Sequence, residues 1–345
     1  MPEALLAIRL RALGDVVLTI PALRALRRGH PGARLEVVTE RRYAPLLEGL
    51  EFVDRVWPLE RTTASTLGLA AALRRRRWSV AVDFFGNARS ALLTRASEAA
   101  LRVGWDARGR RRAYHLRVPR SIDPAGREYA AAAYRRLALA AGGIEDGLET
   151  TLALPAAARA EAVPLLAKSG VPDAGATVGL VAAGTWSTKS WPLSHCAALA
   201  RGLLAAGWPV LLLAGPGEET VSRRLLELAP GVGLLPPCDV VSLAAVIERL
   251  AAVVGTDSGP RHLAAALAVP SWTWFGPTHP GNWLPPGERH GAWWTDLPCR
   301  GCDRTACPHW SCLPSLAPED ALARVLDHLE RHARPAAALG SAARA

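Results

Sequence analysis

The sequence predicts an α/β chain made of two doubly wound domains, each a parallel sheet with helices on both faces. Short apolar runs alternate with helical patterns over the first 150 residues, pause at an Ala-, Pro- and Gly-rich stretch at 155–175, and then restart. With 345 residues, half of them hydrophobic, the chain is long enough to bury two cores.

In the first half, short apolar runs predict strands, and apolar residues at helical spacing predict helices. The strands are expected at 5–10, 35–39, 53–59 and 80–84. The helices are expected at 16–28, 64–77, 89–99 and 127–141. No Gly-x-Gly-x-x-Gly motif follows the first strand, which argues against a dinucleotide-dependent dehydrogenase.

The second half repeats the pattern. Strands are expected at 177–182, 210–214, 232–235, 252–255 and 271–275, and helices at 193–206, 218–228, 243–250, 262–268 and 318–332. The expected organisation is an N-terminal domain at 1–155, a linker at 156–175, a C-terminal domain at 176–317, a last helix at 318–333 and a disordered tail at 334–345. Two such domains leave a cleft at the carboxyl ends of their strands, where open α/β folds bind ligands.

One strand-to-helix junction, at 253–267, has the features of a phosphate site. Asp257 or Ser258 can cap the helix, Gly259 lets a ligand approach the backbone, and Pro260 suits the first turn. Free N–H groups and the positive end of the helix dipole favour a phosphate there. An ordinary strand-to-helix turn is the alternative.

Lysine is rare in this chain. Among 41 basic residues only Lys168 and Lys189 are lysines. Lys189 closely follows an expected strand, and a compact ammonium can sit between phosphate oxygens where a planar guanidinium does not fit. Compositional drift is the alternative, and it is sufficient for Lys168.

The net charge of +10 lies entirely in the first half of the chain. Residues 1–150 hold 26 arginines against 16 acidic residues, whereas the remainder holds 15 basic against 15 acidic residues. This asymmetry predicts an anionic partner for the N-terminal domain: nucleic acid, an acidic membrane surface or an anionic glycolipid. Scattered solvated arginines are the alternative. The sequence has no bilayer-spanning apolar stretch and no signal-peptide pattern at its start, so a cytoplasmic protein is expected.

Four of the six cysteines, Cys299, Cys302, Cys307 and Cys312, have the spacing C-x2-C-x4-C-x4-C. This spacing is similar to a metal knuckle, and in a reducing compartment metal binding is favoured over disulfides. It is compressed relative to common zinc ribbons, so reduced thiols or incidental disulfides stay open.

Several segments together carry a family resemblance. They are Ile8-Arg9 with LGDVVLTIPAL at 13–23, GTWSTKSWP at 184–192, LAGPGEE at 213–219, DSGPRHLAAA at 257–266 and FGPT at 275–278. In order and spacing they resemble the lipopolysaccharide heptosyltransferase family. Members are GT-B glycosyltransferases, with two Rossmann-like domains facing a cleft, that move heptose from an ADP-activated donor to the inner core of lipopolysaccharide.

The resemblance implies an inverting glycosyltransferase with Asp15 as the catalytic base, although Asp15 can instead cap the following helix. The acceptor-binding residues are expected to be Arg9 and Arg11. The donor-binding residues are expected to be Thr185, Ser187, Lys189, Glu218, Glu219, Asp257, Ser258, Gly259 and His262. Arg261 stands where many relatives carry an apolar residue; it can add a phosphate contact or point to solvent, and it is given no role.

The expected co-substrate is an ADP-sugar, with no cofactor required and a divalent cation left open. The expected acceptor is an anionic glycolipid at the inner face of the cytoplasmic membrane, where the enzyme is peripheral, and no nucleic acid is expected. Two alternatives are another nucleotide sugar as donor and a basic nucleic-acid-binding protein. The latter predicts stacking aromatics beside the arginine runs, but Trp78 and Tyr114 are isolated there.

Overall fold

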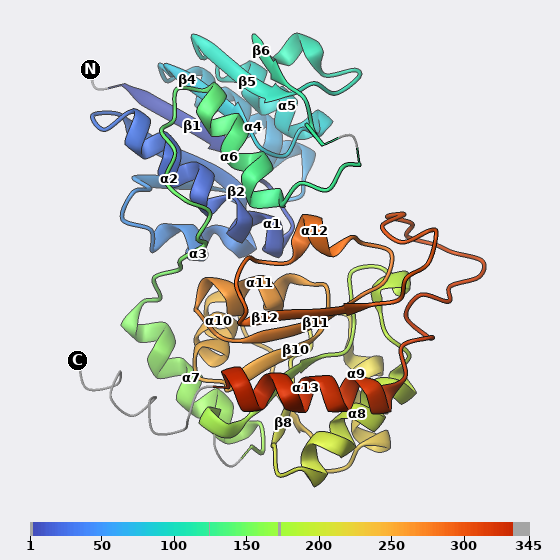
Figure 1. Ribbon diagram of the computed structural model, residues 1–345. Coiled ribbons are helices and arrows are strands. Elements are labelled where there is room, and N and C mark those ends of the chain that lie inside the picture. The colour runs from blue at the N-terminus through green and yellow to red at the C-terminus, as the bar shows by residue number, and fades with distance from the viewer. Residues whose placement is uncertain (1–2, 124, 172–173, 334–345) are drawn as a thin grey trace. The chain divides into compact units, whose positions relative to one another are not determined.

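The computed structural model describes residues 3–123, 125–171 and 174–333. The chain divides into two compact units between Ala153 and Leu154. Each unit contains one six-stranded parallel sheet with helices on both faces (Figure 1). The predicted α/β class is therefore confirmed, whereas the tail predicted at 334–345 lies outside the described residues.

Unit 1 has the strand order β3-β2-β1-β4-β5-β6. Its strands are β1 (Ala4–Ile8), β2 (Arg34–Glu40), β3 (Arg55–Leu59), β4 (Val80–Asp83), β5 (Leu101–Trp105) and β6 (Leu116–Val118). Its helices are α1 (Leu13–Leu18), α2 (Ile20–Gly29), α3 (Ala44–Glu48), α4 (Thr63–Arg74), α5 (Ala88–Ala96) and α6 (Ala130–Ala140), with short 3-10 turns η1 (Arg41–Tyr43) and η2 (Arg111–Ala113).

Strand β1 is the centre of unit 1. Its apolar residues are buried because α2 packs with α6 on one face of the sheet and α4 packs with α5 on the other. Leu5 aligns with Leu35 of β2 on one side and with Val80 of β4 on the other. The chain reverses direction across the sheet between β1 and β4, and at such a switch point open α/β sheets bind ligands.

Two expectations for unit 1 need correction. The single helix predicted at 16–28 is two helices that meet at Thr19, because Pro21 suits a helix start and lacks the N–H that a continuous helix requires. Strands β5 and β6 are not among the predicted strands, since β5 carries an arginine and a glycine and β6 has three residues, two of them exposed.

Unit 2 has the strand order β12-β11-β10-β7-β8-β9. Its strands are β7 (Val178–Val181), β8 (Val210–Leu212), β9 (Gly233–Leu234), β10 (Ala252–Thr256), β11 (Ser271–Phe275) and β12 (His290–Trp294). Its helices are α7 (Ala156–Lys168), α8 (Leu193–Ala205), α9 (Glu219–Leu228), α10 (Val240–Glu248), α11 (Gly259–Ala266), α12 (Pro280–Trp283) and α13 (Pro318–His332), with 3-10 turns η3 (Ala174–Ala176) and η4 (Ser187–Lys189).

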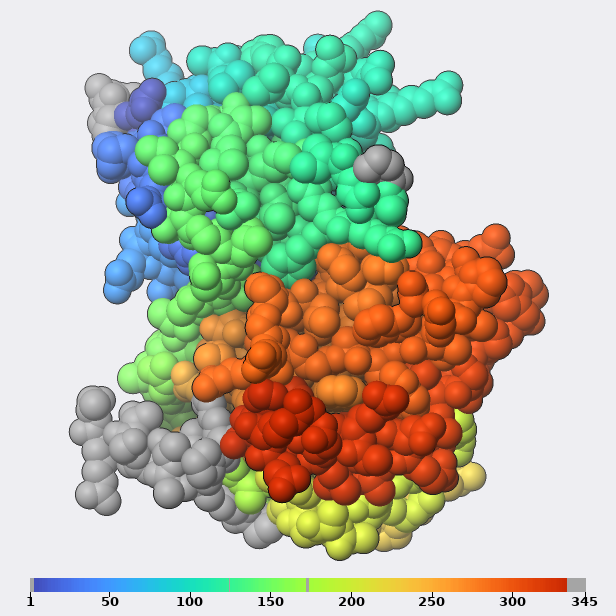
Figure 2. Space-filling view, in the orientation of Figure 1, coloured from blue at the N-terminus to red at the C-terminus, as the bar shows by residue number. Residues whose placement is uncertain are grey.

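Counted from β7, unit 2 repeats the strand order of unit 1, with its switch point between β7 and β10. Helices α8, α9 and α13 enclose one apolar layer against the sheet, with Leu180, Val254 and Trp274 at its centre. The last helix, α13, packs against α8 and forms part of the surface of unit 2, where it is coloured red (Figure 2). Its predicted bounds of 318–332 are confirmed.

The linker predicted at 156–175 is wrong over most of its length. Residues Ala156–Lys168 form α7, which packs against α10, and Arg159 forms an ion pair with Glu248 at 2.7 Å. The Ala-rich composition that suggested a linker is also the composition of a good helix. In the described part of the chain, no helix is both long and apolar enough to cross a membrane.

Candidate functional site

Asp15 lies in the first turn of α1, just after the loop that follows β1. Its Oδ2 accepts a hydrogen bond from the backbone N–H of Ala12 at 3.2 Å, so the carboxylate does cap the helix start. Its Oδ1 lies 2.5 Å from the guanidinium of Arg9 and accepts a 2.5 Å hydrogen bond from the hydroxyl of Tyr134. The side chain remains 19% exposed, so solvent or a ligand can reach it.

Arg9 is buried and joins the ends of β1 and β4. Its Nη1 donates to the carbonyl oxygen of Phe84 at 2.8 Å, and its guanidinium lies 4.7 Å from the ring centroid of Tyr134. Burial alone lowers the pKa of Arg9. The negative charge of Asp15 and the other neighbours raise it by more than burial lowers it, so the pKa of Arg9 lies above the ordinary value. Arg9 therefore holds Asp15, whereas Arg11, its predicted partner in acceptor binding, is exposed.

Tyr134, from α6, is a site residue that sequence reasoning missed. Burial raises the pKa of its hydroxyl well above the ordinary value, so the hydroxyl stays protonated and donates to Asp15. A tyrosine in an Ala-rich helix 119 residues further along the chain gives no local signal of this contact.

The switch point of unit 2 holds a second charged cluster. The ammonium of Lys189, in η4 after β7, lies 2.8 Å from Oδ2 of Asp257, which follows β10. The same Oδ2 accepts a 2.8 Å hydrogen bond from the hydroxyl of Thr278, and Oδ1 accepts one from Arg261 at 2.9 Å. Asp257 is 3% exposed. Its burial opposes ionisation, yet the positive charges of Lys189 and Arg261 hold the pKa of Asp257 well below its usual range.

The Lys189 loop is fixed by its backbone. The hydroxyl of Thr256 donates to the carbonyl oxygen of Lys189, and the hydroxyl of Ser190 accepts from the N–H of Gly184 at 3.1 Å. Gly255 brings β10 close to β7, because a Cβ at this position would lie 2.4 Å from the carbonyl oxygen of Val181. Only glycine fits this close approach.

Arg261 and His262 form the back of this cluster, and both are buried. Arg261 Nη2 donates to Asp257 and lies 2.9 Å from Nε2 of His262. Burial, then Arg261, lowers the pKa of His262 well below its usual value, so the ring is neutral. With Nε2 as the acceptor, the ring proton is on Nδ1.

Several buried polar atoms in this cluster have no hydrogen-bond partner within the described residues. They are Nε and Nη1 of Arg261, Nδ1 of His262 and Oγ of Ser258. The three nitrogens are donors, and a buried donor without an acceptor is costly. This set therefore suits a group rich in acceptor oxygens.

The other predicted donor residues have different surroundings. Ser258 occupies the N-cap position of α11, but its side chain makes no capping hydrogen bond, and the helix begins at Gly259, three residues before the expected start at 262. Thr185 and Ser187 are exposed on the Lys189 loop. After β8, Glu218 accepts from the backbone N–H of Gly215 at 3.0 Å and Glu219 from that of Gly217 at 3.1 Å.

The two glutamates differ in electrostatics. Burial raises the pKa of Glu218, whereas hydrogen bonds from backbone N–H groups lower the pKa of the exposed Glu219. Both carboxylates stabilise the turn at residues 215–217 by accepting hydrogen bonds from its backbone N–H groups, which is a structural role. The Glu218 side chain is nevertheless only partly buried.

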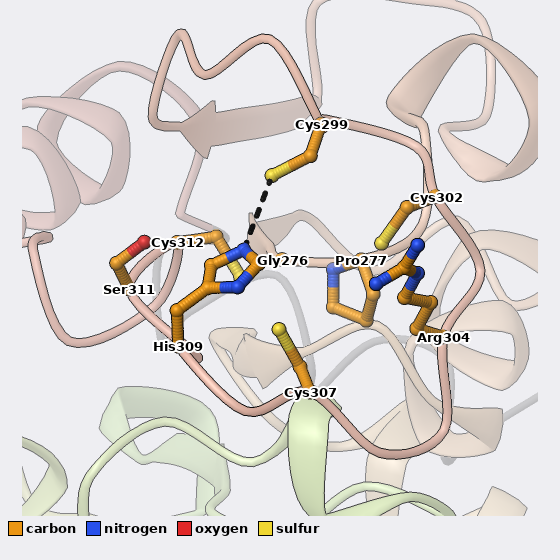
Figure 3. A pocket seen from close by; sticks show the side chains of 9 residues that line it. All are labelled: Gly276, Pro277, Cys299, Cys302, Arg304, Cys307, His309, Ser311 and Cys312. Atoms are coloured by element: carbon orange, nitrogen blue, oxygen red, sulfur yellow. Dashed lines mark hydrogen bonds between the residues drawn. The ribbon is translucent and has the colours of Figure 1, made fainter.

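The four clustered cysteines line one pocket (Figure 3). All are free thiols, and Sγ of Cys299 lies 3.9 Å from Nε2 of His309. Among the described residues, no three His, Cys, Asp or Glu side chains already stand close enough together to hold a metal ion. The other pocket-lining residues are Gly276, Pro277, Arg304, His309 and Ser311.

Comparison with known proteins decides the family. The model of glycosyltransferase family 9 (heptosyltransferase) matches residues 66–311. The chain belongs to glycosyltransferase family 9. Lipopolysaccharide heptosyltransferase 1 of Pseudomonas aeruginosa is 30% identical to it over 328 residues, covering 88% of this chain and 87% of that protein. Lipopolysaccharide heptosyltransferase 1 of Escherichia coli K12 is 27% identical, covering 80% of this chain and 88% of that protein.

Solved structures have the same fold as this family 9 enzyme. The E. coli heptosyltransferase WaaC with ADP has a TM-score of 0.72 at 24% identity and covers 94% of this chain and 100% of its own. A family 9 glycosyl transferase from Veillonella parvula has a TM-score of 0.84 at 19% identity and covers 95% and 98%. The predicted GT-B fold and heptosyltransferase family are thus confirmed, and the alternative of a nucleic-acid-binding protein is set aside.

Proposed function

We propose that this glycosyltransferase moves a heptose from ADP-heptose to the inner core of lipopolysaccharide, or to a related anionic glycolipid, with inversion. The observation that carries this proposal is the cluster of Lys189, Asp257 and Arg261 at the switch point of unit 2, whose unpaired N–H donors suit a diphosphate. The proposal requires that this cluster and Asp15, which belong to different units, serve one reaction.

On the donor side, the leaving ADP carries two phosphates. Fixed donors stabilise the charge that develops on them better than mobile water does. Lys189 supplies a point charge, and the N–H groups at the start of α11, from Ser258 to His262, supply hydrogen bonds and the positive end of a helix dipole. We assign the free N–H groups of Arg261 to the same diphosphate. Thr185, Ser187 and Gly259 lie beside these groups in the chain, and Glu218 and Glu219 are proposed for the ribose hydroxyls.

On the acceptor side, an acceptor hydroxyl attacks the anomeric carbon. The new C–O bond forms as the bond from that carbon to the diphosphate oxygen breaks, and ADP leaves with the electron pair. The hydroxyl proton goes to Oδ2 of Asp15. Arg9 and Tyr134 occupy Oδ1, whereas Oδ2 accepts one hydrogen bond, from the N–H of Ala12, and has a second lone pair to take the proton. We propose that Arg9 positions this base and that Arg11, with the surplus arginines of unit 1, attracts the anionic acceptor.

Three further points stay predictions. We expect the enzyme to require no cofactor, with a divalent ion left open, and to work in the cytoplasm at the inner face of the membrane that carries the acceptor. The partners are then a nucleotide sugar and an anionic glycolipid, with no role for nucleic acid.

The test is direct. The purified chain is incubated with heptose-deficient lipopolysaccharide and one of three donors: ADP-heptose, ADP-glucose or UDP-glucose. The mass of the glycolipid product is then measured by mass spectrometry. We expect the mass of one heptose to be added with ADP-heptose alone. Transfer of another sugar from its nucleotide would replace the donor assignment, and no transfer from any donor while ADP still binds would reject the acceptor class.

A further inference from the structure

The segment between β12 and α13, residues 295–317, contains no helix or strand. Long segments without regular structure are uncommon inside a compact domain, and they usually carry a function or an added constraint. This one is well anchored at its far end, where Leu313 and Leu316 enter the core of unit 2. Residues 295–311 include no fully buried side chain, and Cys299, Cys302 and Cys307 lie there, whereas Cys312 lies next to Leu313 and packs against the core.

The cysteines converge although they are spread over the segment. Cys299, Cys302, Cys307 and Cys312 all line the same pocket, together with the ring of His309 (Figure 3). The two cysteines outside the segment are elsewhere: Cys196 is buried in the α8 layer, and Cys238 is exposed before α10.

The backbone is shaped to allow this convergence. Gly301 lies between the first two cysteines with a φ of +74°, a left-handed conformation that turns the chain and that glycine adopts without strain. At the floor of the pocket, a Cβ on Gly276 would lie 3.3 Å from Sγ of Cys312 and 2.8 Å from the side chain of Leu313. The absence of a side chain at position 276 therefore makes room for the last thiol.

Four thiols that line one pocket form a donor set that suits a soft or borderline metal ion with tetrahedral coordination. We propose that Cys299, Cys302, Cys307 and Cys312 bind one such ion, Zn²⁺ or Fe²⁺, as a structural site. Each thiol that binds gives up its proton. In this structure the four thiols are too far apart to coordinate one ion. Metal binding therefore has to bring the cysteine side chains closer together, as is usual where a site forms on metal binding.

The site has a consequence for the Lys189 loop. The hydroxyl of Thr188 donates to the carbonyl oxygen of Arg304 at 2.7 Å, and Nε1 of Trp310 donates to the carbonyl oxygen of Thr188 at 3.1 Å. Both partners lie between the cysteines, so a bound ion steadies the residue next to Lys189. This consequence for donor binding rests on the proposed function, but the metal site itself does not.

The test measures the metal directly. The full-length chain is purified under reducing conditions without chelator. The amounts of zinc and iron per chain are measured by inductively coupled plasma mass spectrometry. We expect about one ion per chain, its loss in Cys299→Ser and Cys307→Ser, and full retention in the matched control Cys238→Ser. Retention in His309→Ala supports four cysteine ligands, and loss there would overturn this ligand set.

A second measurement covers variants that fail to fold. Wild-type chain is stripped with chelator, reduced and loaded with Co²⁺. Thiolate-to-cobalt charge-transfer absorption, and protection of four thiols from alkylation by added Zn²⁺, are expected. Much less than one ion per chain with no cobalt spectrum, or two disulfides among the four cysteines, would overturn the proposal. Neither measurement uses sugar transfer, so failure here is distinct from failure of the proposed function.

Discussion

Lys189 and Asp257 form a 2.8 Å ion pair between the loops that follow β7 and β10, the two strands at which the sheet of unit 2 changes direction. Asp257 is almost fully buried and shared with Arg261 and Thr278, so the ammonium is held in a fixed position. Positive charge exceeds negative charge in this cluster, and the excess is available to an anion.

Lys189→Ala removes the point charge from this cluster. A lost charge-assisted hydrogen bond is worth about 1.5–3 kcal/mol, so ADP affinity is expected to fall about 10- to 100-fold. Calorimetric titration of the purified chain with ADP measures this change. Lys168→Ala, which replaces the other lysine at the end of α7, is the matched control and should bind ADP normally. Equal affinity of both variants would rule out the phosphate role of Lys189.

Asp15→Asn removes the proposed base while keeping an oxygen for the N–H of Ala12. Loss of a general base lowers turnover by about 100- to 10,000-fold, and ADP affinity should not change because the donor cluster lies in the other unit. Steady-state transfer assays and ADP titration separate these effects. Asp106→Asn, at a surface ion pair with Arg111, is the control. Near-normal turnover in Asp15→Asn would leave Asp15 with its capping role alone.

Regular patterns in the sequence predicted most of the fold. The bounds of β11 and α13 agree with the expected 271–275 and 318–332, because an unbroken buried strand and a strongly amphipathic helix leave little choice. Strand β12 was not predicted. It lies at the sheet edge, reads His-Gly-Ala-Trp-Trp and is only half buried, so its pattern is weak and depends on pairing with β11.

The site residues were predicted more completely than their contacts. Asp15, Lys189 and Asp257 follow strands, and strand ends are visible in the sequence. That Lys189 pairs with Asp257, or that Tyr134 reaches Asp15, depends on which strands and helices are neighbours in space. Arg261 was given no role because the sequence left a phosphate contact and a solvent-facing side chain both open; the structure buries this arginine in the first turn of α11, which no local pattern indicates.

Arg261→Met tests the proposed phosphate contact of Arg261. Asp257 keeps Lys189 and Thr278 as partners, and the variant removes two buried N–H groups that lack acceptors in the described structure. We therefore expect a small change in thermal stability but about a tenfold loss of ADP affinity. Thermal melts with and without ADP measure both. A variant that binds ADP as tightly as wild type would assign Arg261 a packing role only.

Two histidines, His290 at the start of β12 and His328 in α13, predict a loss of stability in mild acid. Burial, then Arg261, lowers the pKa of His290 to about 4, and burial, then His332, lowers the pKa of His328 to about 4. In the unfolded chain both titrate near pH 6.5. Between about pH 6.5 and pH 4 the unfolded state therefore binds protons that the folded state does not, and folding weakens as the pH falls.

Urea denaturation at a series of pH values from about 8 to about 4.5 measures this loss. Each pKa unit corresponds to about 1.4 kcal/mol, so each histidine can remove up to about 3 kcal/mol at the acid end. His328 is 1% exposed and packs against Trp272, with 5.2 Å between ring centroids, so His328→Phe should keep the packing and reduce the pH dependence to the share that His290 contributes. An unchanged slope in that variant would show that His328 already accepts a proton in the folded protein.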